Sequence, residues 1–277
     1  MAAFKRRDML KISRITCGLL LAAMLAGPAG AAGEEIMGSP KWWLKDAGTA
    51  AAAPFKWDTS DLKSIGIFTA AAGVSFLWFD DNLEDYSEKV KHNDFNVLSE
   101  KVRYLGDGLV VVPLFGAAYA YGAAGGGTKL QSAALVGLES YVVSGAFATL
   151  VKFSIHRPRP KTGGSYQSSG NQNFFSTRNL SFPSGHSTSA FSSARVISWY
   201  FGDRGAAPYI SYGIASLVAW SRVNDREHWA SDVVVGSMLG YFTADKIISL
   251  NEARRANTLS LLPFYGDAPG LTASLRF

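Results

Sequence analysis

The stretch 221–232, which reads SRVNDREHWASD, places His228 four residues before Asp232. In a helix, side chains at that spacing share one face, so the carboxylate can bond one ring nitrogen of the imidazole. Such a bond fixes the tautomer and leaves the other nitrogen free to act as a nucleophile. Arg222 adds a planar cation suited to phosphate-like oxygens. Taken alone, the stretch also fits an ordinary helix start with surface charges.

A second stretch, residues 152–160, reads KFSIHRPRP. An apolar helix that ends in cations and then meets prolines would project Lys152 and Arg159 into the loop that follows. Basic residues also cap the C-terminal ends of helices in general, so this stretch alone is compatible with a purely structural role.

A third stretch, residues 181–187, reads SFPSGHS and opens an apolar helix. The Ser184-Gly185 turn would expose backbone N–H groups and a hydroxyl where an anion can settle, with His186 beside them. The alternative is an ordinary serine N-cap followed by a histidine in solvent.

Together these stretches give K-x6-RP, PSGH and SR-x5-H-x3-D, in that order. The set resembles the type 2 phosphatidic acid phosphatase (PAP2) superfamily, which includes bacterial class A acid phosphatases, membrane lipid phosphatases and vanadium haloperoxidases. The resemblance covers residues 60–252. Three motifs with fixed internal spacing, each at an expected helix end, are far more specific than any one of them.

The resemblance implies a role for each matching residue. His228 would attack phosphorus, Asp232 would orient its imidazole, and His186 would protonate the leaving oxygen and then activate water. The remaining matching positions would hold the phosphoryl oxygens: Lys152, Arg159, Ser184, Gly185 and Arg222. Three cations and a helix N-terminus can neutralise a phosphoryl group without a metal, so we expect neither a metal nor a cofactor.

Residues 1–32 differ from the rest of the chain. Five basic residues precede an apolar run and the small-residue segment GPAGAA, which predicts a secretory signal peptide, with a retained anchor helix as the alternative. Without this segment the chain has 22 basic and 21 acidic residues, so the basic balance gives no support to nucleic-acid binding. The single cysteine, Cys17, lies in the same segment, so the mature chain would contain no disulfide.

The pattern after the signal predicts an irregular arm over residues 33–59 and an all-α domain over residues 60–252. Apolar periodicity indicates a bundle of about six core helices of the PAP2/haloperoxidase type, at 62–79, 107–124, 131–152, 186–201, 207–221 and 229–252. Residues 80–103 alternate charges and are expected to be solvated. Alternation in the tail, residues 253–277, predicts a short C-terminal β-hairpin.

Two observations weigh against a full set of membrane spans. Glu139 falls midway along an apolar helix, where a lipid-facing carboxylate would cost about 2.5–3.5 kcal/mol or more. If the signal is cleaved, three crossings would also return the loop after Lys152 to the cytoplasm. We therefore expect an exported periplasmic domain, with membrane association and the oligomeric state left open.

The predicted function is a metal-independent phosphatase acting on a phosphate monoester, either a lipid or a small molecule. A vanadium haloperoxidase is the first alternative, although such enzymes are usually much longer chains. A non-catalytic envelope scaffold is the second, and the intact histidines and Asp232 argue against it. The exposed loop 161–180 would roof the site, where Phe174 and Phe175 could meet an acyl chain or simply anchor the loop.

Overall fold

The computed structural model describes residues 36–56, 58–89, 95–163, 173–202, 205–256, 259–265 and 269–275, so the expected signal segment lies outside the described residues. The domain is all-α, as predicted. Its helices are α2 (Trp43–Ala52), α3 (Thr59–Val74), α4 (Asp80–Lys89), α5 (Phe95–Val102), α6 (Gly108–Tyr121), α7 (Thr128–Ile155), α8 (Gly185–Phe201), α9 (Ala207–Asn224) and α10 (Ala230–Ala256). After the helices, β1 (Leu259–Tyr265) pairs antiparallel with β2 (Pro269–Leu275).

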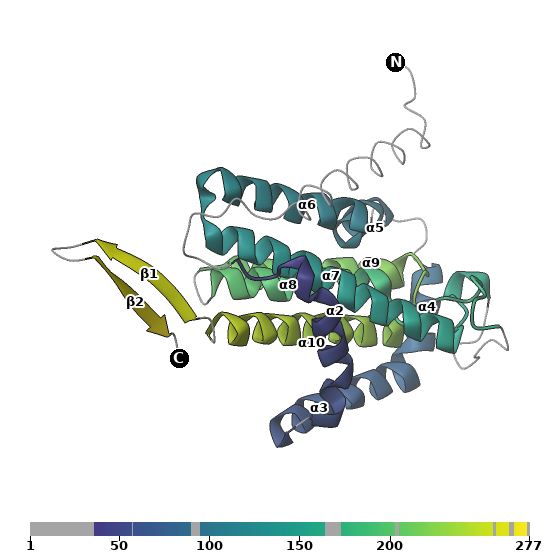
Figure 1. The fold of residues 1–277 in the computed structure, drawn as a ribbon. Coiled ribbons are helices and arrows are strands. Elements are labelled where there is room, and N and C mark those ends of the chain that lie inside the picture. The colour runs from purple at the N-terminus through teal and green to yellow at the C-terminus, as the bar shows by residue number, and fades with distance from the viewer. Residues whose placement is uncertain are drawn as a thin grey trace, which may run out of the picture.

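Helix α8 lies at the centre of the bundle, where it packs against α7, α9 and α10. Helix α6 covers α7, and α2 crosses over α7 and α10 on the near side in Figure 1. Helix α3 runs through a π-helical turn, Ser75–Phe79, directly into α4, and this long element diverges from the rest of the bundle. Such a bundle brings the ends of helices that are distant in sequence to one end of the domain.

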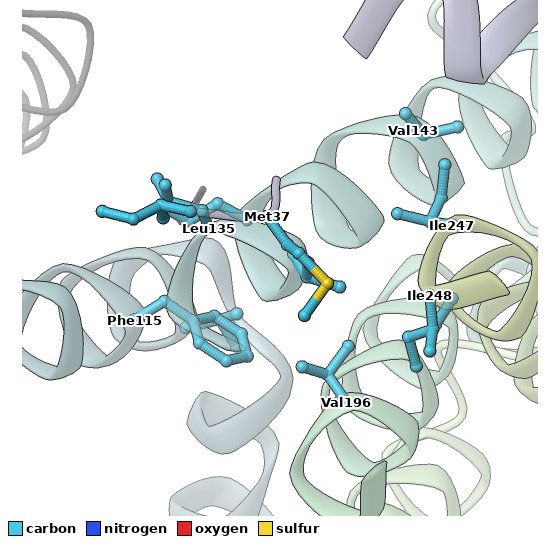
Figure 2. Close-up of a cluster of buried hydrophobic side chains, with 12 residues drawn as sticks. Met37, Phe115, Leu135, Val143, Val196, Ile247 and Ile248 are labelled. Carbon is cyan, nitrogen blue, oxygen red and sulfur yellow. The ribbon is translucent and has the colours of Figure 1, made fainter. Parts of the chain in front are cut away.

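The main hydrophobic core joins four helices to the start of the arm. Figure 2 shows its labelled side chains converging from α6, α7, α8, α10 and the arm: Met37, Phe115, Leu135, Val143, Val196, Ile247 and Ile248. A second cluster, between α8 and α9, is built mainly from alanines. Burial of these apolar groups fixes the helices against one another and thereby fixes the positions of their ends.

Two glycines allow α10 to lie unusually close to α8. A Cβ atom added at Gly236 would stand 2.5 Å from the carbonyl oxygen of Ser184, and one at Gly240 would stand 2.1 Å from that of Thr188. Both distances are far below any real contact, so only glycine is compatible with this approach. Helices that approach through small residues in this way are common in membrane proteins.

Within the part of the chain that the structure describes, four helical segments are long and apolar enough to cross a membrane, namely residues 61–87, 108–125, 128–162 and 230–256. At about 1.5 Å per residue, helices of the length of α7 and α10 exceed the roughly 30 Å hydrocarbon core of a bilayer. The segment 61–87 is only 6% buried within the protein, although it is strongly apolar. This composition supports membrane association.

The sequence-based objection drawn from Glu139 is wrong. Its side chain does not face outward, because it is 0% exposed and lies inside the bundle. The amide of Asn251, on α10, donates to Glu139 Oε2 at 2.9 Å. A carboxylate that faces another helix and has a hydrogen-bond donor does not carry the cost of facing lipid.

Polar contacts also fix the arm to the end of the bundle that lies farthest from the start of α8. The N–H of Gly38 donates to Asn251 Oδ1 at 2.7 Å. The guanidinium of Arg254 donates to both carboxylate oxygens of Asp46, at 2.5 and 2.6 Å, and stacks over the ring of Trp42. We refer to Asp46, Glu139, Asn251 and Arg254 as the arm cluster. Because its members lie on α2, α7 and α10, the predicted irregular arm is in fact an ordered part of the domain.

The expectation that residues 80–103 are solvated fails at three described positions, Asp80, Ser87 and Ser99, of which only Asp80 is a carboxylate. Asp80, the first residue of α4, is 1% exposed, whereas its neighbour Asp81 is exposed. Alternating charge along a sequence predicts a solvated element, but it does not identify the one carboxylate that points inward. The partner that holds Asp80 is part of the candidate site.

Candidate active site

His228 and Asp232 meet as their spacing predicts. His228 lies in the turn between α9 and α10, and Asp232 in the first turn of α10, with Nδ1 of the imidazole 3.6 Å from Oδ2 of the carboxylate. Both side chains are buried, at 5% and 0% exposed. Oδ2 also accepts hydrogen bonds from the hydroxyl of Ser181 and the N–H of Trp229, at 2.5 and 3.0 Å. The carboxylate is therefore fixed with one oxygen toward the ring.

The residues of the PSGH motif lie at the start of α8, next to this pair. Ser184 is the N-cap: its hydroxyl accepts from the N–H of Ser187 at 3.4 Å, and its own N–H donates to the carbonyl of Asp232 at 2.9 Å. The Ser184 side chain is fully buried, and Gly185 opens the helix. The capping role expected as the alternative is thus present, and the backbone bond joins the second motif directly to the third.

Lys152, in the last turn of α7, reaches beneath the same loop. Its ammonium group donates to the carbonyls of Leu180 and Ser181 at 3.0 and 3.3 Å, and also to that of Pro183. Three carbonyl partners mean that Lys152 supports the loop before α8 in addition to supplying positive charge. Since α7 stops at His156, in the left-handed conformation, the chain turns there into the site.

The two arginines that resemble phosphate ligands lie on different elements. Arg222, in the last turn of α9, is 3% exposed and is paired with Asp225 at 3.1 Å, while its Nε has no hydrogen-bond partner among the described residues. Arg159 lies in the loop after α7, has a half-exposed side chain and bonds the carboxylate of Glu227. An unpaired buried donor and a partly exposed cation are both suited to receive an anion.

His186 is the more accessible of the two imidazoles, with 34% of its side chain exposed. Its Nε2 lies 3.8 Å from Oδ2 of Asp107, the residue that caps α6. The preceding Gly106 lies so close that an added Cβ would stand 2.8 Å from the carbonyl of His186. The glycine thus allows the Asp107 turn to lie against the start of α8.

Charges from the first and third motifs shift the pKa values of both imidazoles. Burial lowers the pKa of His228 to about 4 against the opposing effect of Asp232, and the cations Lys152 and Arg159 lower it further. Burial likewise lowers the pKa of His186 to about 4, with Arg222 and Lys152 among the contributing charges. Because Lys152 acts on both rings, the two imidazoles share one electropositive environment, in which each ring is neutral at pH 7.

Five contacting residues were not identified from the sequence: Asp80, Asp107, Arg157, Ser181 and Glu227. Arg157 was hidden beside Arg159 in an Arg-Pro-Arg-Pro run, and Ser181 directly precedes the PSGH motif. The other three are carboxylates whose partners are distant along the chain. Among the described residues, no cluster of His, Cys, Asp and Glu could hold a metal ion.

Comparison with known proteins agrees with this geometry. Residues 133–255, which contain all three motifs, match the family model described as the PAP2 superfamily. This part of the chain is similar to the PAP2 superfamily, and we call the helical domain that contains it the PAP2 domain. The matched region of the PAP2 domain begins within α7 and ends within α10, and thus contains every helix end that carries a motif.

The PAP2 domain resembles the crystal structure described as the first transmembrane PAP2 type phosphatidylglycerolphosphate phosphatase, from Bacillus subtilis. The sequences are 20% identical, the TM-score is 0.55, and the alignment covers 69% of this chain and 96% of the other. A crystal structure of Aquifex aeolicus LpxE aligns at 22% identity with a TM-score of 0.45, over 62% and 95% of the two chains.

A lipid A 1-phosphatase from Porphyromonas gingivalis is 37% identical to this chain over 68 residues. The match covers 24% of this chain and only 15% of the length of that relative.

Proposed function

We propose that this protein is a metal-independent phosphatase that hydrolyses phosphate monoesters through a phosphohistidine at His228. The observation that carries the proposal is the buried imidazole whose Nδ1 faces the fixed carboxylate of Asp232 at 3.6 Å. With Nδ1 engaged, Nε2 is the nitrogen available for attack. Similarity to the PAP2 superfamily, whose sequence motifs these residues match, supports the same assignment.

In the first step, Nε2 of His228 attacks phosphorus while the bond to the leaving oxygen breaks. His186 gives its proton to that oxygen, so the alcohol leaves neutral. In the second step, neutral His186 takes a proton from water, whose oxygen attacks phosphorus as the phosphorus–nitrogen bond breaks. Phosphate is released, and both imidazoles return to their starting states.

Binding of the phosphoryl group is assigned to the residues around the two imidazoles: Lys152, Arg159, Ser184, Gly185 and Arg222. Arg222 has an unpaired Nε, and Arg159 can exchange Glu227 for the substrate. Lys152 and Ser184 are already bonded to protein groups, so we assign them mainly to the charge and shape of the cradle. Phosphoryl transfer depends chiefly on such positioning and charge neutralisation.

The low pKa of His186 in the empty site has a consequence for the first step. At pH 7 this imidazole is neutral, whereas a general acid must carry a proton. A bound phosphate dianion would raise the pKa of His186, because an adjacent negative charge favours the imidazolium. The substrate would thus bring about the protonation state that its own cleavage requires.

We propose that the substrate is a lipid phosphate. Four helices capable of crossing a membrane support this class, as does Phe175, which is 85% exposed beside the site loop. Its neighbour Phe174 instead packs on Phe153 of α7, at 5.9 Å between ring centroids, so that one ring anchors the loop and the other is free to meet an acyl chain. The substrates named for similar proteins, lipid A 1-phosphate and phosphatidylglycerol phosphate, are the first to test.

The number of membrane crossings before the site predicts on which side of the membrane the site lies. If α3, α6 and α7 all cross the membrane, the loop that follows α7, with the site, lies on the side opposite to the arm. A periplasmic site, as we propose, then requires a cytoplasmic arm, which is incompatible with export of residues 36–56 by a cleaved signal. Cysteines introduced separately at Ser39 and Thr162, in a Cys17→Ser background, should react with a membrane-impermeant maleimide from opposite sides. Labelling from one side only would contradict the spans.

The decisive experiment compares the wild-type protein with His228→Ala on a panel of lipid and soluble phosphates, in detergent. We expect hydrolysis by the wild type, no inhibition by EDTA, and trapping of a phosphohistidine that is labile in acid. Equal activity of both proteins would eliminate His228 as the nucleophile. Halide oxidation with added vanadate, in place of hydrolysis, would assign the chain to haloperoxidase chemistry.

A further inference from the structure

A buried cation lies behind the His228–Asp232 pair. Arg157, in the loop after α7, is only 4% exposed. Its Nη1 donates to Oδ1 of Asp232 at 2.5 Å, and its Nη2 donates to Oδ2 of Asp80 at 2.7 Å. One guanidinium therefore joins the carboxylate that faces the nucleophile to a second carboxylate on α4, and both carboxylates are excluded from solvent.

Further contacts hold the Asp80 carboxylate and the Arg157 guanidinium in place. Ser231 accepts from Nη1 of Arg157 at 2.7 Å, and its hydroxyl and N–H donate to the two oxygens of Asp80 at 2.7 and 2.8 Å. The guanidinium also lies over the rings of Phe76 and Trp229, at 5.3 and 5.4 Å. Asp80 and Arg157 thus have protein partners on every side and need no substrate to satisfy them.

Arg157 and Arg159 divide two tasks between them. The intervening Pro158 is held by its carbonyl, which accepts from Nε1 of Trp229 at 2.8 Å. Arg157 points into the protein toward Asp232, whereas the half-exposed Arg159 points to the rim and Glu227. Because Arg157 cannot reach the substrate, any effect that it has on catalysis must pass through Asp232.

We infer that Asp80 and Arg157 are positioning residues that set how strongly Asp232 orients and holds the imidazole of His228. The inference rests on the proposed function and extends it to residues outside the three motifs. Arg157 draws part of the negative charge of Asp232 away from the ring, and Asp80 in turn engages part of the cation. The pair therefore adjusts the nucleophile without contacting it.

Other charges face the same groups and stay unchanged in the test. His228 is faced by Asp232 from α10, by Lys152 from α7 and by Arg159 from the following loop. Ser181, from the loop before α8, bonds the same oxygen of Asp232 that faces the ring. Among the described residues, the side chain bonded to the opposite oxygen of Asp232 is that of Arg157, so changes at Asp80 or Arg157 act on that oxygen.

The two residues have opposite predicted effects. Arg157→Gln returns the full charge of Asp232 to the ring, so the pKa of His228 rises and the acidic limb of kcat/KM moves to higher pH. Asp80→Asn leaves Arg157 to Asp232 alone, so the same pKa falls and the limb moves to lower pH. We expect kcat to fall about 10- to 100-fold in Arg157→Gln because the ring loses its alignment, with KM nearly unchanged.

Matched variants separate this effect from simple loss of structure. Asp81→Asn removes an exposed carboxylate from the same helix and should shift nothing. Arg157→Lys keeps the charge and should hold the acidic limb near its wild-type position while kcat falls. If Arg157→Gln does not fold, the double variant Asp80→Asn/Arg157→Gln leaves one buried carboxylate without its arginine in place of two. Because Asp80 acts through Arg157, the limb should stay at higher pH than in the wild type, and a limb moved to lower pH would overturn the inference.

The pKa of His228 can also be measured without turnover, by NMR titration of protein labelled with ¹³C-histidine. The chain contains only four histidines, so single His→Gln variants assign the signals. Opposite shifts in Asp80→Asn and Arg157→Gln support the inference, and shifts that are absent or in the same direction overturn it. An inactive wild type that still shows opposite shifts would refute the proposed function alone.

Discussion

The two ends of the bundle each contain a buried network with carboxylates and one arginine, and they differ in what remains available. In the arm cluster, Arg254 holds both oxygens of Asp46, and Asn251 joins the arm to α7. At the site end, Arg157 takes only one oxygen of Asp232, and the other faces an imidazole. The arm cluster connects segments of the chain, whereas at the site end one oxygen of Asp232 is left to orient the imidazole of His228.

The comparison shows why burial and charge alone do not mark an active site. Asp46 and Asp232 are both nearly inaccessible and both paired with arginine. Buried atoms without a hydrogen-bond partner occur at both ends, at Oε1 of Glu139 and at Nε of Arg222, so what distinguishes the site is the presence of partly exposed groups that can exchange partners, such as Arg159 and His186. Substitutions at the two ends should therefore affect different quantities.

The largest expected difference is between His228→Ala and Asn251→Ala. Removing the nucleophile should lower kcat by about 10⁴-fold or more, because covalent catalysis is lost. Removing the equally buried Asn251 should lower the melting temperature but leave kcat within about threefold, since it contacts no reacting group. Steady-state kinetics on folded, detergent-purified protein measures both. Similar losses of kcat in the two variants would contradict the claim that the arm cluster supports stability and the site end supports activity.

The next largest effect should be on stability at the arm cluster. Asp46→Asn removes the carboxylate partner of Arg254, and we expect a loss of about 2–3 kcal/mol of unfolding free energy. Thermal unfolding followed by circular dichroism checks this, with the exposed Asp81→Asn as control. Activity per folded molecule should not change. A variant as stable as the wild type would show that the arm is held by its apolar contacts instead.

The pH dependence sharpens the description of the site end. In the free enzyme His186 must be protonated to act as the acid, and burial lowers its pKa to about 4. Above about pH 5, kcat/KM should therefore fall by about tenfold per pH unit, after correction for ionisation of the substrate. Below about pH 4, protonation of His228 should lower it again. In His186→Gln the fall on the basic side should disappear. An optimum above pH 8 would contradict these roles.

The smallest predicted effect concerns Glu227, whose carboxylate bonds both Arg159 and Lys161. Glu227→Gln frees Arg159 for the phosphate in the ground state and the transition state alike, so KM should fall by about three- to tenfold with kcat nearly constant. Glu84→Gln, which removes a rim carboxylate bonded to Arg226, is the control. A higher KM in Glu227→Gln would mean that this carboxylate positions Arg159 and does not compete for it.

Much of the helical framework could be predicted from the sequence, because each apolar run between Gly, Pro or charged residues forms one helix. The run that was expected to end at Lys152 continues to Ile155, where His156 adopts a left-handed conformation. The sequence predicted that His228 meets Asp232, but through helical spacing, whereas His228 lies in the turn that precedes α10. The N-cap at Ser184 followed from the composition of its turn.

The remaining features of the site depend on contacts between distant residues. Asp80 and Asp81 have the same local signal, yet only Asp80 is bonded, across 77 residues, to Arg157. Glu139 was counted as an argument against membrane spans because its partner, Asn251, lies 112 residues away and has no local signal. Local periodicity assigns a face of a helix, but only the packed bundle decides which polar residue finds a donor there.

The glycines of α10 have no Cβ atom, and this absence sets the distance between α10 and the start of α8. At Gly236, a single methyl group would collide with the backbone that begins the His186 turn, and would displace one histidine from the other by pushing two helices apart. An alanine there would leave both histidines in the protein but would increase the distance between the elements that carry them. The separation between the start of α8 and α10 therefore depends on the absence of one carbon atom.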